Sequence, residues 1–352
     1  MRLPSYLESS LEPLALMVQD RLAVIGGVVL LAIIAMALFA PLIATHDPRL
    51  INEIEDGSVL VRGEEAVWRL EPSLGPFALS GADSFGDQAL VVGRAGTAFL
   101  RRDGRWAELR TGTTADLLDT AFGPDGSALV VGHGGTVLLV DGQRWQPIAT
   151  PAPVELRGVA WIDDTSALIV GTGETLWRLD LAPSPVIREL ASPVGRGFPL
   201  NAVARDADGT LLAVGDRGLA LRYDPTSDQL ALERLGTTRE LNGLHITAAG
   251  TALAVGERGT LLRRAAGTTR WIADDAPDTR ALRAGWIDDT GRALAVGRNG
   301  VILERAGEGE GWIRAETESE RHLRTLFVLQ GTMVALGSDL FVNRLLRALP
   351  FR

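Results

Sequence analysis

The amino-acid sequence predicts an all-β fold, a seven-bladed β-propeller preceded by a single N-terminal transmembrane helix. Three observations lead to this prediction: a glycine-hinged apolar phrase that recurs at a steady period, one long apolar run near the N-terminus, and a turn-rich composition. The chain has 352 residues, of which 40 are glycine and 5% are aromatic. Such a composition suits a β protein with many turns better than a helical one.

Composition and charge exclude several kinds of chemistry. The chain has no cysteine, which rules out disulfides, thiolate catalysis and cysteine-based zinc sites. All 35 basic residues are arginine, so Schiff-base and P-loop lysines are absent as well. The formal net charge of −9 argues against a nucleic-acid partner, because phosphate binding needs a basic field.

The apolar run covers residues 22–45 and contains no charged side chain. A helix of this length spans about 36 Å, enough for a hydrocarbon core of about 30 Å. Secretory signals normally have a shorter apolar stretch after a basic start, so we expect a retained membrane anchor rather than a cleaved signal. It would follow a leader of residues 1–21 and precede a linker of residues 46–56.

Flanking charges favour one orientation of this anchor only slightly. Arg2, Arg21 and the amino terminus lie on one side of the run, and Arg49 and Arg62 lie on the other. The positive-inside rule then favours a cytoplasmic N-terminus. We therefore expect a single-pass protein of the inner membrane, with the domain that follows in the periplasm or otherwise outside the cytoplasm.

The glycine-hinged phrase, as in ALVVGHGGTVLL at residues 128–139, occurs seven times. Successive copies are 39 to 44 residues apart. A steady period near 40 residues in a strand-rich chain is typical of propeller blades. The glycine after each apolar run is Gly93, Gly132, Gly171, Gly215, Gly256, Gly297 or Gly337.

Each repeat has room for the four strands of one blade. In residues 154–190 we expect strands in VELRGVAWIDD, SALIVG, ETLWRLD and VIREL. Aspartate and glycine mark the first hairpin, and Gly-x-x-Gly marks the second, where we attribute the glycines to positive φ. The nearly continuous apolar runs indicate strands that are buried on both faces.

The two ends of the repeat region complement one another. Residues 57–68 can be laid over the third-and-fourth-strand hairpin at 135–145, whereas the last repeat supplies clear first and second strands at 322–329 and 332–337. We expect residues 57–71 to complete the blade begun by 321–343, so that a propeller of residues 57–343 closes without free strand edges. Residues 344–352 would form a tail, although 339–352 could instead add a third strand.

Two copies of the phrase also carry a fuller motif, Val-Gly-x-x-Gly-Thr followed by Asp-Gly-(x)-Arg-Trp. The carriers are Gly93, Gly96, Thr97, Asp103, Gly104 and Trp106, and then Gly132, Gly135, Thr136, Asp141, Gly142 and Trp145. This wording resembles the BNR-like, or YVTN-type, repeats of the photosystem II stability and assembly factor family. The resemblance implies a seven-bladed, non-enzymatic, extracytoplasmic protein that helps membrane complexes assemble. The chain departs from that family in its degenerate Asp-boxes and its long anchor.

The apolar run is similar to a second family. The stretch DRLAVIGGVVLLAIIAMALFAPLIATHDP resembles the first membrane span of oligopeptide-type ABC permeases. With no further span in the sequence, a permease function does not follow from this resemblance. It implies a cytoplasmic N-terminus and a helix that packs against other membrane helices.

The tryptophans that recur at the blade period are expected to be structural. We expect them to pack between strands, with arginines at the ends of third strands stacked on their rings. The tryptophans are Trp68, Trp106, Trp145, Trp271 and Trp312, and the arginines are Arg62, Arg101, Arg264 and Arg305. Trp161 and Trp286 each begin a Trp-Ile-Asp-Asp-Thr phrase and are expected to cap the core near a rim.

The second-hairpin turns should all emerge on one face of a propeller, and basic residues recur in them. We predict a partner-binding rim there, since arginine recognises carboxylates of an acidic peptide through paired hydrogen bonds. Solvated hairpin tips are the alternative interpretation. The predicted rim consists of Arg94, His133, Arg217, Arg258 and Arg298. The assembly-factor resemblance implies an arginine patch that recognises a client protein, without matching individual residues.

No catalytic, metal or cofactor site is predicted. A sialidase-like enzyme needs a tyrosine nucleophile assisted by a glutamate, and Tyr223 with Glu233 is an unsupported candidate pair. The histidines lack ligand spacing, and two pairs of aspartates suit turns better than calcium. These residues are His46, His133, His245 and His322, with Asp163, Asp164, Asp288 and Asp289.

The sequence therefore favours a non-enzymatic, membrane-anchored, extracytoplasmic scaffold. It would bind an integral-membrane or secreted protein and assist assembly or stability of a membrane complex or transporter, with no nucleic acid and no small-molecule substrate. Two alternatives stay open: a glycan- or small-ligand-binding propeller, including a sialidase-like hydrolase, and a permanent accessory subunit of a membrane complex.

Overall fold

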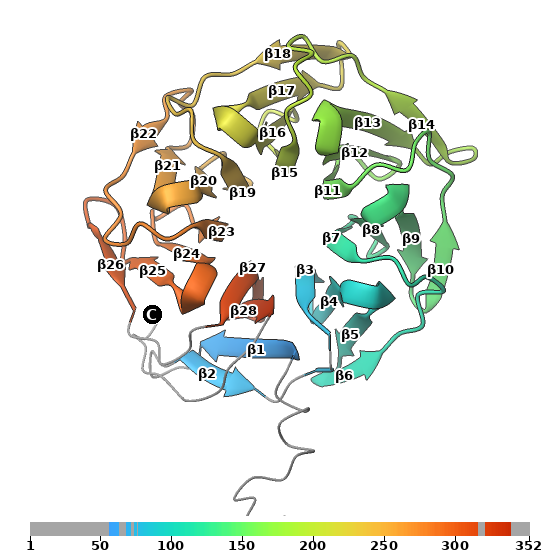
Figure 1. Ribbon diagram of the computed structural model, residues 1–352, viewed down its shortest axis with the longest axis horizontal. Helices are drawn as coiled ribbons and strands as arrows, with labels where there is room; N and C mark the ends of the chain where they lie inside the picture. The colour runs from blue at the N-terminus through green and yellow to red at the C-terminus, as the bar shows by residue number, and fades with distance from the viewer. Residues whose placement is uncertain (1–55, 63–67, 72–73, 76, 316–320, 339–352) are drawn as a thin grey trace, which may run out of the picture. The chain divides into compact units, whose positions relative to one another are not determined.

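The computed structural model describes residues 56–62, 68–71, 74–75, 77–315 and 321–338. These residues form seven four-stranded antiparallel sheets around a central opening (Figure 1). The predicted all-β propeller is thus confirmed. The predicted leader, the transmembrane helix at 22–45, the linker up to residue 55 and the C-terminal tail lie outside the described residues. Within the described ranges, no helix is long and apolar enough to cross a membrane.

Six sheets are each built from four consecutive strands, with the first strand innermost and the fourth outermost (Figure 1). The first two are β3 (Leu79–Phe85), β4 (Gln88–Gly93), β5 (Ala98–Arg102) and β6 (Arg105–Glu108), then β7 (Leu117–Phe122), β8 (Ala128–Gly132), β9 (Val137–Asp141) and β10 (Arg144–Pro147). The next two are β11 (Leu156–Trp161), β12 (Ser166–Gly171), β13 (Thr175–Asp180) and β14 (Val186–Glu189), then β15 (Leu200–Arg205), β16 (Leu211–Gly215), β17 (Ala220–Asp224) and β18 (Gln229–Leu232). The last two are β19 (Leu241–Ile246), β20 (Ala252–Gly256), β21 (Thr260–Arg264) and β22 (Ile272–Ala273), then β23 (Leu282–Ile287), β24 (Ala293–Gly297), β25 (Ile302–Arg305) and β26 (Trp312–Arg314).

The remaining sheet combines strands from both ends of the described region. β27 (His322–Leu329) and β28 (Thr332–Ser338) form its inner half, and β1 (Asp56–Arg62) and β2 (Trp68–Glu71) form its outer half. β1 pairs antiparallel with β28, with Val61 opposite Val334. Trp68 is fully buried beside Leu294 and Val296 of the preceding blade, and its Nε1 donates to Glu304 at 3.1 Å. Strands from the two ends of the described region thereby form one sheet and close the ring.

The glycine that ends each second strand has a different role from the one predicted. At Gly93 the φ is −164°, which is extended backbone, so positive φ does not explain the residue. A Cβ there would collide with the carbonyl oxygen of Ala78, just before the first strand. The next amide, that of Arg94, donates to the same carbonyl at 2.9 Å. Glycine is required at this position because two backbones approach closely. Gly96, the second glycine of the phrase, does have a positive φ of 73°.

Six short 3-10 turns connect the second and third strands of the six continuous blades (Figure 1). They are η1 (Arg94–Gly96), η2 (His133–Gly135), η3 (Thr172–Glu174), η4 (Asp216–Gly218), η5 (Glu257–Gly259) and η6 (Arg298–Gly300). Each first strand starts beside the end of its second strand, as Leu156 pairs with Gly171. All six turns therefore lie at the end of the ring where the inner strands begin, which we call the turn face. The opposite end carries the first and third hairpins of each blade and is called the hairpin face.

Second strands form the core between blades. Every residue of β8 is buried, as the continuous apolar runs predict. Neighbouring blades pack through these strands, and Leu168 and Val170 of one blade share a cluster with Leu211 and Ala213 of the next. Each such buried aliphatic side chain contributes about 1.5–3 kcal/mol to folding. The outermost strands are more exposed, so stability rests on the inner three strands of each blade.

The tryptophan prediction holds for one pair that can be checked directly. The Arg264 guanidinium lies 5.3 Å from the centre of the Trp271 ring, as a cation–π contact requires. Arg305 instead donates to backbone carbonyls, with Nε 3.0 Å from the Glu310 oxygen. Trp161 is almost fully buried, whereas Trp286 lines the central channel.

Candidate functional site

Every innermost strand carries a β-bulge directly after the leucine at its start, which is the first residue of six strands and the second residue of β27. In β11 the register shifts between Leu156 and Gly158, which leaves Arg157 without a direct partner. The same shift occurs in the six other inner strands. A bulge re-aims the extra side chain, here into the central channel. The seven residues, which we call the bulge ring, are Ser80, Leu118, Arg157, Asn201, Asn242, Arg283 and Arg324.

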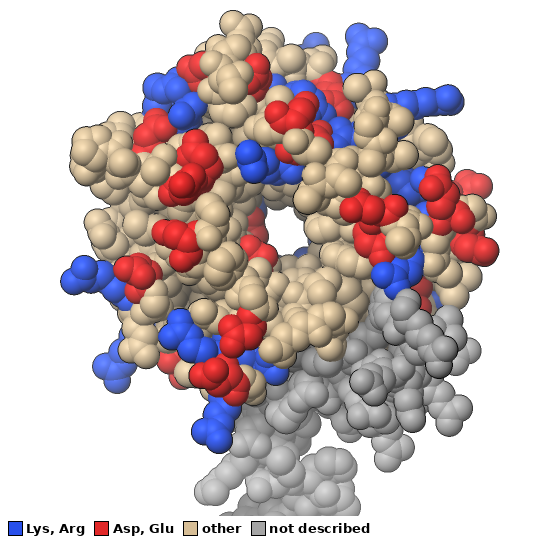
Figure 2. Space-filling view, turned by 180° about the vertical axis from the view of Figure 1, so that it is seen from behind, with Lys and Arg blue, Asp and Glu red and all other residues tan. Residues whose placement is uncertain are grey.

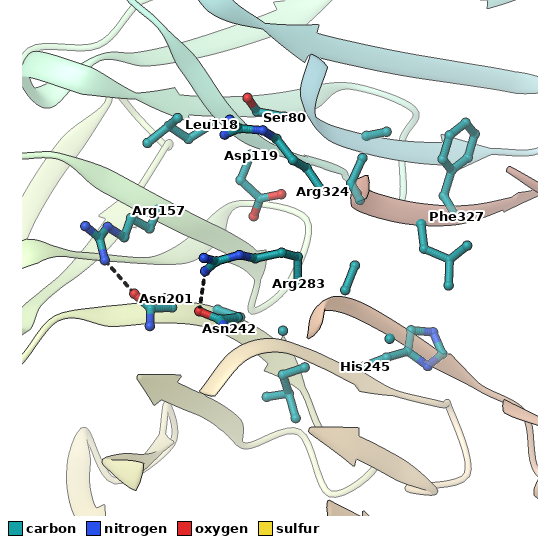
Figure 3. Close-up of a pocket in the computed structure, with 18 of the residues that line it drawn as sticks. Ser80, Leu118, Asp119, Arg157, Asn201, Asn242, His245, Arg283, Arg324 and Phe327 are labelled. Carbon is teal, nitrogen blue, oxygen red and sulfur yellow. Dashed lines mark hydrogen bonds between the residues drawn. The ribbon is translucent and has the colours of Figure 1, made fainter. Parts of the chain in front are cut away.

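The bulge ring surrounds a channel of about 920 Å³. In the space-filling view the centre of the ring is open, and both acidic and basic side chains lie on the face around it (Figure 2). Figure 3 shows Arg157, Arg283, Arg324 and Asp119 reaching into the same space, with His245 and Phe327 toward its other end. The channel is therefore a polar cavity with charged walls rather than a packed core.

Two asparagines of the bulge ring connect neighbouring blades. Asn201 Nδ2 donates to the Leu241 carbonyl, and Asn242 Nδ2 donates to the Leu282 carbonyl, both at 2.9 Å. Their own side-chain oxygens accept hydrogen bonds from arginines. Arg157 donates to Asn201 at 2.7 Å and Arg283 donates to Asn242 at 2.8 Å (Figure 3). The asparagines thus hold both the blade interfaces and the guanidinium groups in place.

Three arginines gather at the turn-face mouth of the channel, and we call them the basic arc. Arg283 and Arg324 come from the bulge ring, and Arg298 comes from η6. Burial lowers the pKa of Arg283, and the positive charges of Arg298 and Arg324 add to this effect. Glu257 and Glu240 lie 3.5 and 3.8 Å from Arg283, distances that leave its charge only partly compensated. A bound anion would relieve this mutual repulsion.

An acidic group lies next to the basic arc on the same face. Burial raises the pKa of Glu240, and the negative charges of Asp216 and Glu257 raise it further. Asp216 accepts a hydrogen bond from Asn201 at 3.0 Å. The mouth thus has a basic side and an acidic side, so a ligand would bind in a defined orientation.

Two carboxylates connect blades on the other side of the channel. Asp83 accepts a hydrogen bond from the Phe122 amide at 2.8 Å, and Asp119 accepts one from the Val159 amide at 3.0 Å. Burial raises the pKa of Asp83 to about 6 and that of Asp119 to about 7, and the charge of Asp83 contributes to the latter shift. Both side chains keep part of their surface toward the channel.

His245 occupies the same place in β19 as Asp83 in β3, four residues after the first leucine. Its Nδ1 accepts a hydrogen bond from the Ile287 amide of the next blade at 3.3 Å. Burial lowers the pKa of His245 to about 4, so the ring is neutral and can act as an acceptor. Its ring also lies 6.2 Å from that of Trp286.

The five residues of the predicted rim are all exposed on the turn face, but they do not form one group. Arg94 and His133 begin their turns and approach Asp116, at 3.9 and 3.8 Å. Arg298 also begins its turn and lines the channel. The other two, Arg217 and Arg258, hold the second turn position, each with a φ of 56°. Arg217 stacks on Phe198 at 5.1 Å instead of facing the channel.

The arginines of the bulge ring are not among the residues predicted from the sequence. A signal for them existed, because a polar residue follows the leucine that starts several first strands, as in VELRGV, RALRAG and RHLRTL. An arginine at that place, inside an otherwise apolar strand, indicates a side chain that points into the channel. Its recurrence at the blade period would have identified Arg157, Arg283 and Arg324.

The sialidase-like pair considered from the sequence is not assembled. Tyr223 is fully buried, and its hydroxyl donates to Asp228 at 2.6 Å and accepts from Arg178 at 3.1 Å. Glu233 instead pairs with Arg222 at 2.7 Å. The tyrosine therefore has no access to a substrate in the channel.

Turn chemistry accounts for the predicted aspartate pairs. Asp163 and Asp288 accept hydrogen bonds from Thr165 and Thr290 within their own hairpins, at 2.8 and 2.9 Å to the amides. In the part of the chain that the structure describes, no three histidine, aspartate or glutamate side chains are grouped so that they could hold a metal ion.

The fold and the channel define the class of protein as a β-propeller with a polar central cavity, an architecture that serves both binding and catalysis. Residues 17–57 match the family model of the N-terminal transmembrane domain of oligopeptide transport permease C. No curated protein matches the chain. The permease resemblance noted in the sequence is thus found independently.

Solved structures with a similar fold include proteins of different function. A streptogramin B lyase structure has a TM-score of 0.66 at 14% identity, covering 80% of this chain and 98% of the other. YCF48 from Cyanidioschyzon merolae has a TM-score of 0.62 at 17% identity, covering 83% and 99%. YCF48 bound to a D1 peptide has a TM-score of 0.59 at 14% identity, covering 80% and 94%. The resemblance to the photosystem II assembly factor is confirmed, and at these identities it shows the fold alone.

Proposed function

We propose that this protein is a non-enzymatic, membrane-anchored, extracytoplasmic scaffold that binds a protein partner and assists a membrane complex. The apolar run and its permease-like match at residues 17–57 support the anchor. The similarity to YCF48, one structure of which is bound to a peptide, supports a binding role for the propeller. The observation on which the proposal depends most is the basic arc at the channel mouth.

An acidic segment of the partner is the ligand that suits the basic arc. Guanidinium groups bind carboxylates through paired, charge-assisted hydrogen bonds. Asn242 already holds Arg283 in position, which lowers the entropy lost on binding. The turn residues Arg94, His133, Arg217 and Arg258 are exposed on the same face as the mouth.

A lyase function, which the similarity to streptogramin B lyase raises, has less support in the channel. His245 already accepts a backbone hydrogen bond, and His322 accepts one from the Asn299 amide at 2.9 Å. Among the described residues, neither imidazole is hydrogen-bonded to a carboxylate that would orient it as a general base. We therefore propose a binding protein. It acts either as a permanent subunit of a membrane complex or as a transient assembly factor.

Affinity purification of the full chain, with its anchor intact in mild detergent, tests this proposal. A variant of the basic arc, R283A/R298A/R324A, is compared with the wild type and with R105A/R144A/R270A. The control removes the same charge from exposed third hairpins on the hairpin face. We expect a membrane protein to copurify with the wild type and the control, and at least tenfold less with the basic-arc variant.

Two outcomes would contradict the proposal. One is that no membrane protein copurifies with the intact chain. The other is that the basic-arc variant and the hairpin-face control recover the same partner equally well. A partner in fixed stoichiometry would indicate a permanent subunit, and a substoichiometric one would indicate an assembly factor.

A further inference from the structure

The carboxylates of Asp83 and Asp119 face the channel without a cationic partner. Among the described residues neither forms an ion pair, and their hydrogen bonds come from backbone amides of the next blade. Figure 3 shows Asp119 pointing into the same pocket as Arg283 and Arg324. An acidic ligand that enters at the basic arc would therefore approach two uncompensated negative charges deeper in the channel.

The charged groups around these carboxylates are few. β3 packs against β7 and β27, and the titratable or charged side chains that β27 presents to the channel are His322 and Arg324. β7 packs against β3 and β11, and the latter brings Arg157 with Glu155 just before it. Glu155 Oε1 lies 2.6 Å from Arg157 Nε, and this ion pair compensates the positive charge of the guanidinium. Among the described residues, none of these cations forms an ion pair with Asp83 or Asp119, whose hydrogen bonds come from backbone amides.

We propose that Asp83 and Asp119 make docking of an acidic segment in the channel pH-dependent, with tighter binding when these carboxylates carry protons. When both are ionised, they repel the carboxylates that the basic arc attracts. Protonation removes this repulsion while the arginines keep their charge. The proposal rests on the proposed function, since it concerns the same ligand and the same mouth.

The raised pKa values of both groups support this inference. Burial raises the pKa of Asp83 to about 6 and that of Asp119 to about 7, so their protonation changes between mildly acidic and mildly alkaline pH. Ordinary aspartates titrate near pH 3.9 and would stay ionised throughout that range. Two charges at about 10 Å from a ligand carboxylate in a partly hydrated channel change its affinity by about tenfold.

Fluorescence anisotropy with a labelled hexaglutamate peptide tests the proposal on the full chain in detergent. Affinity is measured between pH 5.5 and 8 at constant ionic strength, where the peptide itself remains ionised. We expect the wild-type Kd to fall about tenfold from pH 8 to pH 5.5. D83N/D119N, and D119N if the double variant fails to fold, should bind at pH 8 nearly as tightly as the wild type binds at pH 5.5.

Two control variants separate this effect from other proton-binding groups. D164N removes one negative charge from an exposed hairpin on the hairpin face and should keep the wild-type profile. H133Q/H322Q removes the two histidines of the turn face and should also keep it. A flat wild-type profile, or one that D119N leaves unchanged while H133Q/H322Q abolishes it, would overturn the inference. Failure of the proposed function is seen separately, as binding that does not respond to R283A/R298A/R324A at any pH.

Discussion

Two sides of the channel wall solve the same structural problem with different chemistry. On one side, Asn201 and Asn242 donate side-chain hydrogen bonds to carbonyls of the next inner strand. On the other, Asp83 and Asp119 accept hydrogen bonds from amides of the next inner strand. Both pairs tie neighbouring blades together at the channel. Only the second pair can change its charge.

The difference shows how a structural contact can acquire a functional property. An amide has no titratable proton, so the asparagine side keeps its hydrogen bonds at any moderate pH. A carboxylate buried in the channel wall is costly to ionise, which couples its protonation to folding. The two pairs of interblade contacts are therefore expected to differ in their response to pH, and the following predictions test that contrast.

The largest expected effect is a pH dependence of stability that arises from the carboxylate side. The folded-state pKa values of Asp83 and Asp119 are raised, so the folded state binds more protons than the unfolded state between about pH 4 and 7. Stability is therefore highest below this window and is lost as the pH rises through it. From pH 5 to pH 8 the loss from this pair should be roughly 3 kcal/mol.

Urea denaturation of the wild type and D83N/D119N at several pH values measures this loss. The asparagine oxygen can still accept the amide hydrogen bond, so the variant should keep the fold while its stability varies much less with pH. D164N is the matched control, because it removes a carboxylate from an exposed turn. A variant profile as steep as that of the wild type would show that other groups cause the dependence.

A smaller effect of opposite sign is expected from His245. Its folded-state pKa is lowered to about 4, so the unfolded state binds more protons between about pH 4 and 6.5. Its contribution to stability is fully present above this window and is lost as the pH falls through it. Replacing His245 by glutamine should remove a loss of about 2 kcal/mol between pH 7 and 5. Thermal melts of H245Q and the wild type at these two pH values provide the measurement, and equal shifts in both proteins would contradict it.

The sequence was sufficient for the architecture because the repeat itself encodes the blade. Gly93 and its six counterparts recur at nearly constant spacing, and a blade is the supersecondary unit that fits it. The hairpin likeness of residues 57–68 also anticipates how β1 and β2 lie beside β28. Such features depend on local pattern, which a single sequence displays directly.

The channel was harder to predict because its side chains break the strand pattern. Arg157 reaches the channel only through a bulge, and alternation along a strand does not reveal a one-residue shift. Turn composition was misleading in a similar way, since Arg298 begins its turn and lines the channel while Arg217 holds the second position and stacks on Phe198. These differences are set by backbone geometry within the turn rather than by residue type.

One turn also departs from the repeat in a way that only the structure explains. Glu174 stands where the other five turns have glycine, with a φ of 62°. Its carboxylate accepts hydrogen bonds from the amides of Arg196 and Gly197, both at 2.8 Å, and from the Ser192 hydroxyl. These bonds offset the strain of a left-handed glutamate and fix the loop that leads to β15.

The smallest effect in the comparison is expected on the asparagine side. Replacing Asn242 by alanine removes the donor to the Leu282 carbonyl, but water in the channel can take its place, so the loss should be about 1 kcal/mol. This loss should be the same at pH 5 and pH 8, because no proton is bound or released. N201A, which removes the donor to the Leu241 carbonyl, should lose a similar amount of stability, again independent of pH.

Urea midpoints of N242A at both pH values separate the two sides of the wall. A pH-independent loss would show that the Asn242 contact acts independently of the titrating groups, including Asp83 and Asp119. A loss that grows with pH would mean that Asn242 also acts through Arg283, to which its side-chain oxygen is bound, and through the carboxylates around that arginine. The charges on the asparagine and carboxylate sides would then be coupled. The two sides would differ only in how strongly their contribution to stability depends on pH.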